Sequence, residues 1–274
     1  RLRPVAWVGP LAVGVYVARQ LFHGSPFDNT FGQRARFAHG EDREIDMNII
    51  WLGHGSFRIE IEDKVLLIDP WIDGNPVFPD EKREEAIVGA TDILVTHGHF
   101  DHIADVPAIS KETSAPVHGM YELANHLFGE GAVEGNAFQR GGTISLGAVE
   151  VSLVPASHSS SAGDDRQNTG CETGFIIKGE GHTIYFSGDT GIMADMDWIG
   201  DYYKPDIGIL SAGGYFTMDM KGAAYAAKRY FSFSIVIPCH YKTFPLLEQS
   251  ADALKDGLPG VNVIEPEVMM PIAL

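Results

Sequence analysis

The residues from His97 to His102 place three imidazoles and one carboxylate in six positions, in the order His-x-His-x-Asp-His. Gly98, inside this run, lets the backbone bend sharply between the first two imidazoles. Imidazole nitrogen and carboxylate oxygen are the ligands that zinc and related divalent ions take, at about 2.0–2.2 Å. The run therefore predicts a metal site, the alternative being a surface histidine patch or an adventitious site.

An apolar, β-branched stretch, Asp92–Thr96, precedes the run and is typical of a buried strand. Active sites commonly lie where loops leave the ends of such strands. Four ligands in so short a turn cannot all reach one ion, so we expect two ions and further ligands from other strand ends. The first ligand-type residues after three other apolar strands are His158, Asp189 and His240. Taken singly, each is more often a turn or capping residue.

Several segments around these residues form one pattern. They are Trp51–Phe57, Leu67–Pro70, Ser187–Gly191, Gly213–Met218 and Ile237–Pro245. With the histidine run, they resemble the metallo-β-lactamase superfamily from Met47 to the C-terminus. The similar branch contains short metal-dependent hydrolases, related to L-ascorbate-6-phosphate lactonases and phospholipase-D-type phosphodiesterases. Tyr215 and Lys242 stand where those relatives often carry Asn, so fine specificity does not carry over.

The resemblance implies an α/β fold of the α+β kind, an αββα four-layer sandwich with the metallo-β-lactamase fold. It also implies a set of ligands for each ion. The first metal would be held by His97, His99 and His158, the second by Asp101, His102 and His240, and Asp189 would bridge both. Zn²⁺ is the expected ion, and the same ligands accept Mn²⁺ or Fe²⁺.

The chemistry of two adjacent ions predicts hydrolysis. They lower the pKa of a bridging water, and the resulting hydroxide attacks a carbonyl carbon or phosphorus. We expect Asp101 to orient the hydroxide. His54 is expected to bind substrate or to protonate the leaving group, the alternative being a structural role in its turn. Asp69 is either a partner that fixes a ligating imidazole or a strand-end hydrogen-bonder. The predicted function is a dinuclear metal-dependent hydrolase that cleaves a small ester-like bond, a lactone or a phosphodiester.

Two other functions are compatible with a metal site of this kind. Some members of the superfamily are iron-dependent redox enzymes, but a complete second ligand set disfavours a mononuclear iron site. A dinuclear redox centre is expected to carry an acidic residue where this chain has His99. The third function is a non-catalytic scaffold stabilised by its metals, which usually shows lost ligands.

Composition limits the partners. The chain has 274 residues, the range of one large domain with a short appendage, and a net charge of −17. Such a surface repels polyanions, so we expect a small-molecule substrate and no nucleic acid. The chain contains two cysteines, Cys171 and Cys239. Two thiols make no disulfide framework, which favours a cytoplasmic location, and Cys239 is expected to be a buried strand residue.

Residues 1–46 form an extension of uncertain role before the hydrolase domain, 47–274. An apolar stretch, Pro4–Ala18, follows Arg1 and Arg3 and resembles an export or anchor segment. It is short for a membrane span, so no stable membrane insertion is expected. The other two interpretations are an ordered extension that packs on the domain or a partner, and foreign upstream sequence. Relatives commonly assemble, so a homo-oligomer is expected.

Periodicity predicts the following elements. The strands are Asn48–Leu52, Phe57–Ile61, Val65–Ile68, Thr143–Leu146, Glu150–Val154, Thr173–Lys178, Thr183–Ser187, Ile207–Leu210, Ser234–Ile237 and Val261–Ile264. The helical stretches are Asp80–Val88, Pro107–Ser110, Tyr121–Phe128, Ala194–Tyr203, Lys221–Tyr230 and Pro245–Lys255. His118, His126 and His182 are expected to be surface or structural residues.

Overall fold

Side chains that point to alternate faces along each strand decide how the layers of this protein pack. The structure, a computed structural model, describes residues 47–274. In β1 (Asn48–Gly53), Ile49 and Trp51 point into one hydrophobic cluster, whereas Leu52 points into another. Successive side chains of a strand lie on opposite faces, so β1 is apolar on both sides. A strand of this kind belongs in the middle of a layered protein.

Two large sheets carry most of the strands. The first has the order β16 (Pro271–Ala273), β1, β2 (Ser56–Ile61), β3 (Lys64–Ile68), β4 (Asp92–Val95), β5 (Val117–Met120) and β6 (Glu134–Phe138). The second has the order β15 (Asn262–Val263), β14 (Ile235–Cys239), β13 (Ile207–Ser211), β12 (His182–Phe186), β11 (Thr173–Gly179), β8 (Val149–Pro155) and β7 (Thr143–Leu146). A short ribbon pairs β9 (Ser161–Ala162) with β10 (Gln167–Asn168).

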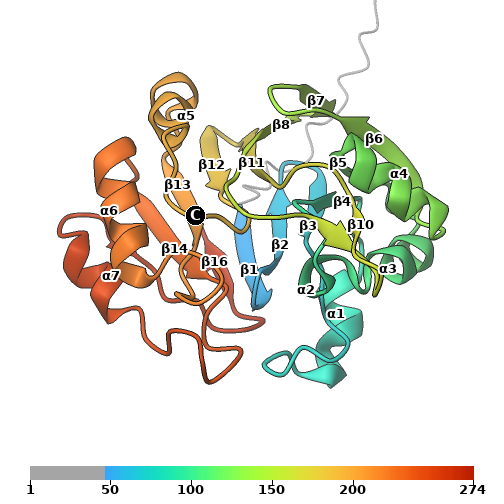
Figure 1. Cartoon of the computed structure of the whole chain (residues 1–274), viewed down its shortest axis with the longest axis horizontal. Coiled ribbons are helices and arrows are strands. Elements are labelled where there is room, and N and C mark those ends of the chain that lie inside the picture. The colour runs from blue at the N-terminus through green and yellow to red at the C-terminus, as the bar shows by residue number, and fades with distance from the viewer. Residues whose placement is uncertain (1–46) are drawn as a thin grey trace, which may run out of the picture. The chain divides into compact units, whose positions relative to one another are not determined.

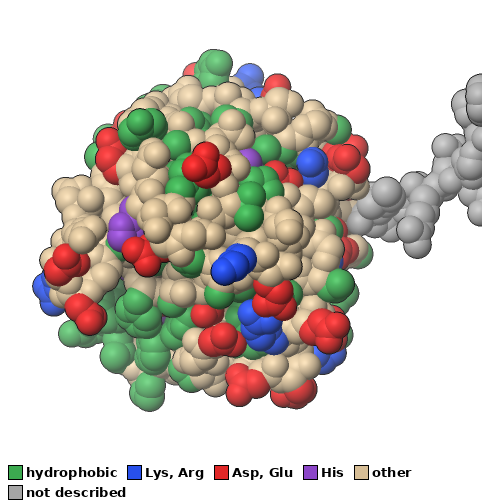
Figure 2. Space-filling model, turned by 90° about the vertical axis from the view of Figure 1, so that its right-hand side faces the viewer, with side chains coloured by type: hydrophobic (Ala, Val, Ile, Leu, Met, Phe, Trp, Pro, Cys, Tyr) green, Lys and Arg blue, Asp and Glu red, His purple; other side chains and the backbone are tan. Residues whose placement is uncertain are grey.

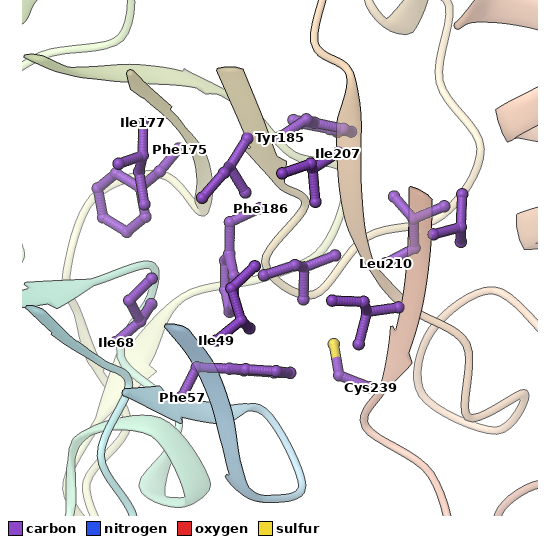
Figure 3. Close-up of a cluster of buried hydrophobic side chains, with 14 of the residues drawn as sticks. Ile49, Phe57, Ile68, Phe175, Ile177, Tyr185, Phe186, Ile207, Leu210 and Cys239 are labelled. Atoms are coloured by element: carbon purple, nitrogen blue, oxygen red, sulfur yellow. The ribbon is translucent and has the colours of Figure 1, made fainter. Parts of the chain in front are cut away.

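Helices cover the outer faces of both sheets (Figure 1). On the first sheet these are a 3₁₀ turn (Asp80–Lys82), α1 (Arg83–Ile87), α2 (Phe100–Ile103), α3 (Val106–Thr113) and α4 (Tyr121–Gly129). On the second they are α5 (Met196–Tyr203), α6 (Met220–Tyr230) and α7 (Asp252–Gly257). Between the sheets lies a buried core to which both contribute, as with Phe57 and Phe186, whose rings meet edge to face (Figure 3). The predicted αββα sandwich is confirmed.

Both sheets end in parallel strands. The first sheet pairs β3 with β4, β4 with β5 and β5 with β6 in parallel. The second pairs β12 with β13, β13 with β14 and β14 with β15 in the same way. Parallel strands present their carboxyl ends at one edge of a sheet, where ligand sites of α/β proteins collect. Two such edges are therefore available to build a site.

One predicted helix is wrong in its first half. Pro245–Lys255 was expected to be helical, but only Asp252–Gly257 is. The preceding residues form turns, in which the Leu247 N–H donates to the carbonyl oxygen of Phe244. The sequence pattern also missed β5, β6 and α2. β5 contains His118 and Gly119, and β6 is partly exposed along its whole length, so neither shows a clear strand pattern.

On the face that Figure 2 shows, Lys and Arg side chains are scattered among acidic ones. Within residues 47–274, no helix is both long and apolar enough to cross a membrane. Residues 1–46 lie outside the described residues, so their division from the domain and the three interpretations of that extension stay predictions.

Candidate metal centre

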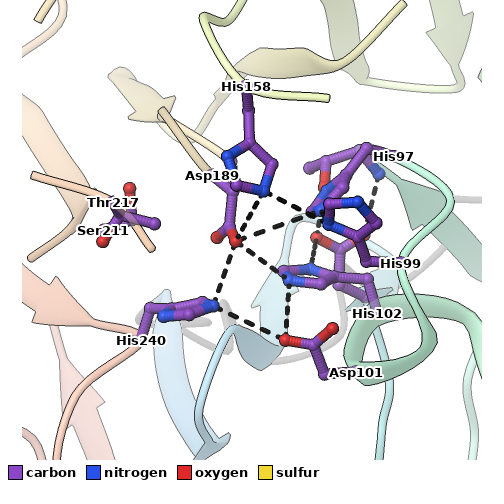
Figure 4. Close-up of polar contacts among 12 residues, drawn as sticks. His97, His99, Asp101, His102, His158, Asp189, Ser211, Thr217 and His240 are labelled. Atoms are coloured by element: carbon purple, nitrogen blue, oxygen red, sulfur yellow. Dashed lines mark hydrogen bonds and ion pairs between the residues drawn. The ribbon is translucent and has the colours of Figure 1, made fainter. Parts of the chain in front are cut away.

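The predicted ligands meet where strand ends of both sheets come together. His97 and His99 follow β4, and Asp101 and His102 lie in the short helix α2 that continues this loop. The remaining three arrive from the second sheet: His158 follows β8, Asp189 follows β12, and His240 follows β14. All seven side chains converge in one cluster, with Asp189 at its middle (Figure 4).

Three imidazole nitrogens form the first group. His97 Nε2 lies 3.0 Å from His99 Nδ1, and His158 Nε2 lies 3.2 Å from that same nitrogen. Two nitrogens that share a tetrahedral zinc at 2.0–2.1 Å lie about 3.3 Å apart. The spacing of this group therefore fits a single divalent ion, and all three atoms lie within 4.8 Å of one another.

A carboxylate and two imidazoles form the second group. Asp101 Oδ2 lies 3.6 Å from His102 Nε2 and 3.5 Å from His240 Nε2. Both of these nitrogens are buried and have no hydrogen-bond partner among the described residues. Buried polar atoms are normally satisfied, so two unpartnered nitrogens that face one carboxylate fit a bound cation.

Asp189 lies between the two groups. Its Oδ2 is 3.9 Å from His97 Nε2 and 3.6 Å from His158 Nε2 in the first group. In the second group, the same oxygen is 3.5 Å from His102 Nε2 and 3.0 Å from His240 Nε2. One oxygen thus faces both groups, as the predicted bridging role of Asp189 requires.

Charge complements this arrangement. Burial acts to raise the pKa of Asp189, but His240 and His102 outweigh it and hold that pKa well below 3.8. Burial acts to lower the pKa of His240, but Asp189 and Asp101 outweigh it and raise that pKa to about 9. Burial and the neighbouring His102 hold the pKa of His97 well below 6.5, which keeps its nitrogens available as ligands. Without metal, the centre therefore combines ionised carboxylates with neutral His97 in the first group and protonated His240 in the second. A divalent cation bound in the second group would take the place of the His240 proton between the same carboxylates.

A buried network supports the ligands from behind. Asp69, at the end of β3, accepts hydrogen bonds from the N–H and hydroxyl of Thr96 and from Nδ1 of His102. This matches the first interpretation of Asp69, as a partner that fixes an imidazole. Three residues here adopt left-handed backbone conformations, namely His54 (φ 52°), Asp69 (φ 47°) and His240 (φ 58°). Such strain outside glycine is concentrated at functional sites.

Gly98 is needed for a different reason from the expected one. It does not take a positive φ, unlike many glycines of this chain. A Cβ at this position would instead collide with Thr169 Oγ1, and the Gly98 N–H donates to Ser160 Oγ at 3.0 Å. Close packing against the loop after β8 therefore requires glycine here.

His54 is fully buried beside the second group. Its Nε2 lies 2.8 Å from Asp101 Oδ2, and its Nδ1 lies 2.8 Å from Thr243 Oγ1. Burial and the adjacent His240 lower its pKa to about 4. Sequence reasoning found His54 but missed Thr243, because no local pattern relates two residues so far apart in the chain.

The three histidines that were expected to be surface or structural residues do not belong to the cluster. Among them, His118 donates from Nε2 to Asp92 in the interior, His182 contacts Asp206, and His126 lines the cavity described next.

A cavity of about 1340 Å³ opens over the cluster. Its lining includes His99, Asp101, His158, Asp189 and His240. Such a volume accommodates a small-molecule ligand. Ligand-type side chains, ionised carboxylates and an adjoining cavity together define a candidate catalytic metal centre.

Comparison with known proteins gives the same assignment. The profile of the beta-lactamase superfamily domain matches residues 64–256. A UPF0173 metal-dependent hydrolase of Roseobacter denitrificans is 66% identical over 227 residues, 82% of this chain and 99% of the relative. A UPF0173 metal-dependent hydrolase of Ruegeria pomeroyi is 60% identical over 228 residues, which is 82% of this chain and 99% of that relative. The solved structure of Igni18, a metallo hydrolase of the archaeon Ignicoccus hospitalis, matches with a TM-score of 0.74 at 30% identity, over 83% of this chain and 98% of that one.

The chain therefore belongs to the beta-lactamase superfamily, among its UPF0173 metal-dependent hydrolases. The resemblance inferred from the sequence is confirmed, and the protein is a metal-dependent hydrolase. These relatives support the hydrolase prediction. The roles assigned to the individual site residues stay predictions.

Proposed function

We propose that this protein is a dinuclear hydrolase whose substrates are small uncharged esters, lactones in particular. The observation that carries the dinuclear part is the position of Asp189 Oδ2, within 3.0–3.9 Å of nitrogens in both ligand groups. Zn²⁺ is the proposed ion in both positions, with Mn²⁺ and Fe²⁺ as alternatives that the same donors accept.

Two divalent ions held by these residues would supply a hydroxide at neutral pH and would offset negative charge on the substrate oxygen. The chain's own residues then have separate tasks. Asp189 and Asp101 bring two negative charges into a buried cluster, and the histidines hold their nitrogens toward it. Asp101 is the proposed catalytic residue that orients the attacking oxygen, since its Oδ2 faces the second group at the edge of the cavity.

Apolar side chains in the lining of the cavity support a substrate with a hydrophobic part. Phe100, Phe216 and Leu246 line it and are 65%, 51% and 53% exposed. Large apolar groups left this accessible beside a polar centre favour contact with a hydrophobic ligand group. An alkyl or aryl substituent on the ester would cover such side chains.

Charged side chains in the same lining support an uncharged substrate. The lining carries the carboxylates of Glu130, Asp164 and Asp165 and one guanidinium, Arg166. The two ions would attract the negative charge of a phosphodiester, but these carboxylates, which lie outside the ligand groups, would repel it, whereas a lactone carries no charge. The lining thus favours the lactone over the phosphodiester.

The test is turnover of metal-replete protein on lactones and on bis(p-nitrophenyl) phosphate, with Asp101→Ala as the blank. Lactones of one ring size are compared with and without an alkyl chain. We expect lactone cleavage that disappears in the blank, and a kcat/KM roughly 10-fold higher with the chain present, the scale of discrimination in an apolar pocket. Preferred cleavage of the phosphodiester would overturn the choice of lactone. Activity on neither would overturn both substrate classes.

We further propose a cytoplasmic homo-oligomer that acts on small molecules and not on nucleic acid. Cys171 is exposed and Cys239 is buried in β14, and both are free thiols, which suits a reducing compartment. The acidic composition opposes binding to polyanions. Light scattering of the purified protein tests the oligomer.

A further inference from the structure

The turn Gly53–Ser56, which joins β1 to β2, touches the second ligand group at several points. The side chain of His54 reaches Asp101, with 2.8 Å between Nε2 and Oδ2. A carboxylate only accepts hydrogen bonds, so the proton of the His54 ring must lie on Nε2. Nδ1 is then an acceptor, and its partner must donate.

That partner is Thr243, which lies beyond β14. Its Oγ1 is 2.8 Å from His54 Nδ1 and 3.2 Å from the carbonyl oxygen of Tyr241. The hydroxyl has one proton, which goes to the nearer His54 nitrogen. A directional chain therefore runs from Thr243 through His54 to Asp101. With both ring nitrogens engaged, His54 has no proton to deliver to a leaving group.

The backbone of the same turn holds a second predicted ligand. The carbonyl oxygen of His54 accepts the N–H of His240 at 2.8 Å, and Nε1–H of Trp51 at 2.9 Å. The His54 and His240 rings lie 3.8 Å apart between centroids. His240, strained at φ 58°, is thus fixed by its own N–H as well as by ring packing.

The third ligand of the group packs on the glycine of the turn. A Cβ on Gly55 would lie 2.8 Å from Cε1 of His102, closer than side chains tolerate. The next residue, Ser56, donates to the carbonyl oxygen of Asp69 at 2.7 Å, and Asp69 holds Nδ1 of His102. Within the described domain, no hydrogen bond joins this turn to His97, His99 or His158.

We propose that the Gly53–Ser56 turn is a positioning device for the second metal ion alone, and that His54 and Thr243 are positioning residues that aim Asp101. This inference rests on the two-ion part of the proposed function. It replaces proton donation as the role of His54. Partners of this kind typically change metal affinity by 10–100-fold.

Thr243→Val and Thr243→Ser form a matched pair, since both are close in size to threonine and only serine keeps the hydroxyl. Zn²⁺ affinities are measured by competition with a chromophoric chelator, and occupancy by Co²⁺ absorption. In Thr243→Val we expect one dissociation constant to rise roughly 10–100-fold and the other to stay unchanged, while Thr243→Ser behaves as wild type. The constant that changes should be the one lost in Asp101→Ala.

A second variant guards against misfolding. In His54→Gln an amide N–H can still donate to Asp101, so its loss of affinity should be smaller than that of His54→Leu. Unchanged affinities in Thr243→Val and His54→Leu, or equal weakening of both constants, would overturn the positioning role and leave the two-ion centre intact. A wild-type protein that binds a single ion would overturn the two-ion centre and this inference with it.

Discussion

Asp69 Oδ2 lies 2.8 Å from His102 Nδ1, and both residues are buried. The same chemistry occurs once more at the other end of β4, where Asp92 Oδ1 lies 3.0 Å from His118 Nε2. Among residues 47–274, Nε2 of His102 has no hydrogen-bond partner, whereas Nδ1 of His118 accepts the N–H of Asn136. The first pair is therefore arranged as the predicted ligand role of His102 requires, and the second is closed within the protein.

Asp69→Asn should weaken binding of the second ion roughly 10–100-fold, because a neutral amide no longer holds the His102 ring through a charged hydrogen bond. Chelator competition measures this affinity. The matched control is Asp92→Asn, which should lower stability and leave both metal affinities unchanged. Equal metal affinities in wild type and Asp69→Asn would contradict the role given to Asp69.

The Asp92 pair also predicts a pH dependence of stability. Burial acts to raise the pKa of Asp92, but the hydrogen bond from His118 and the charge of Lys64 outweigh it and hold the pKa below 3.8. A carboxyl group with a depressed folded-state pKa stabilises the protein above its unfolded pKa, and this stabilisation is lost as pH falls through the folded value.

Asp92→Asn should therefore cost about 1–3 kcal/mol near pH 7 and progressively less as pH falls below 4. Urea denaturation of both proteins at pH 7, 5 and 3 measures the difference. A difference that stays constant over this range would show that the charge of Asp92 plays no part.

Asp189→Ala should weaken the binding of both ions, since Asp189 Oδ2 faces both ligand groups. Asp101→Ala should weaken the binding of only one ion, because Asp101 belongs to the second group. Loss of a ligand should cost at least as much as loss of an outer partner, which is about 10–100-fold in affinity. Metal content after dialysis, measured by mass spectrometry, gives the stoichiometry. Retention of one tightly held ion in Asp189→Ala would exclude a bridging position.

Removal of the metals should destabilise the fold. A ligand present at 100 times its Kd stabilises the native state by about 2.7 kcal/mol. At about 2–4 °C per kcal/mol for a domain of this size, chelation should lower Tm by about 5–11 °C from that condition. Calorimetry with and without a chelator, followed by re-addition of Zn²⁺ or Mn²⁺, measures this. An unchanged Tm would mean that the cluster holds its shape without ions.

Much of the centre could be predicted because strand ends mark it. His158, Asp189 and His240 each follow an apolar strand, and the structure brings all three to the His97–His102 run. What escaped prediction depends on contacts between distant segments. The partnership of His54 with Thr243, and the packing of Gly98 on Thr169, exist only after both sheets have formed.

The failed part of the helix predicted over Pro245–Lys255 has a similar cause. Local propensity favoured a helix, but Phe244 and Leu246 line the cavity, and Lys242 takes a left-handed conformation at φ 63°. The backbone conformation of this segment is therefore set by the contacts around the cavity and not by local helix propensity. Tertiary contacts override local pattern most often at such places.

The distribution of ligands between the two sheets has a mechanical consequence. The Gly141–Gly142 region separates β1–β6 from β7–β15, and only β16 crosses back to the first sheet. Ions bound by ligands from both sheets would form a reversible cross-link between the two halves of the domain. Two fragments produced by cleavage at this turn would then associate more strongly with metal than without it. The metal centre would thus stabilise the fold as well as catalyse the reaction.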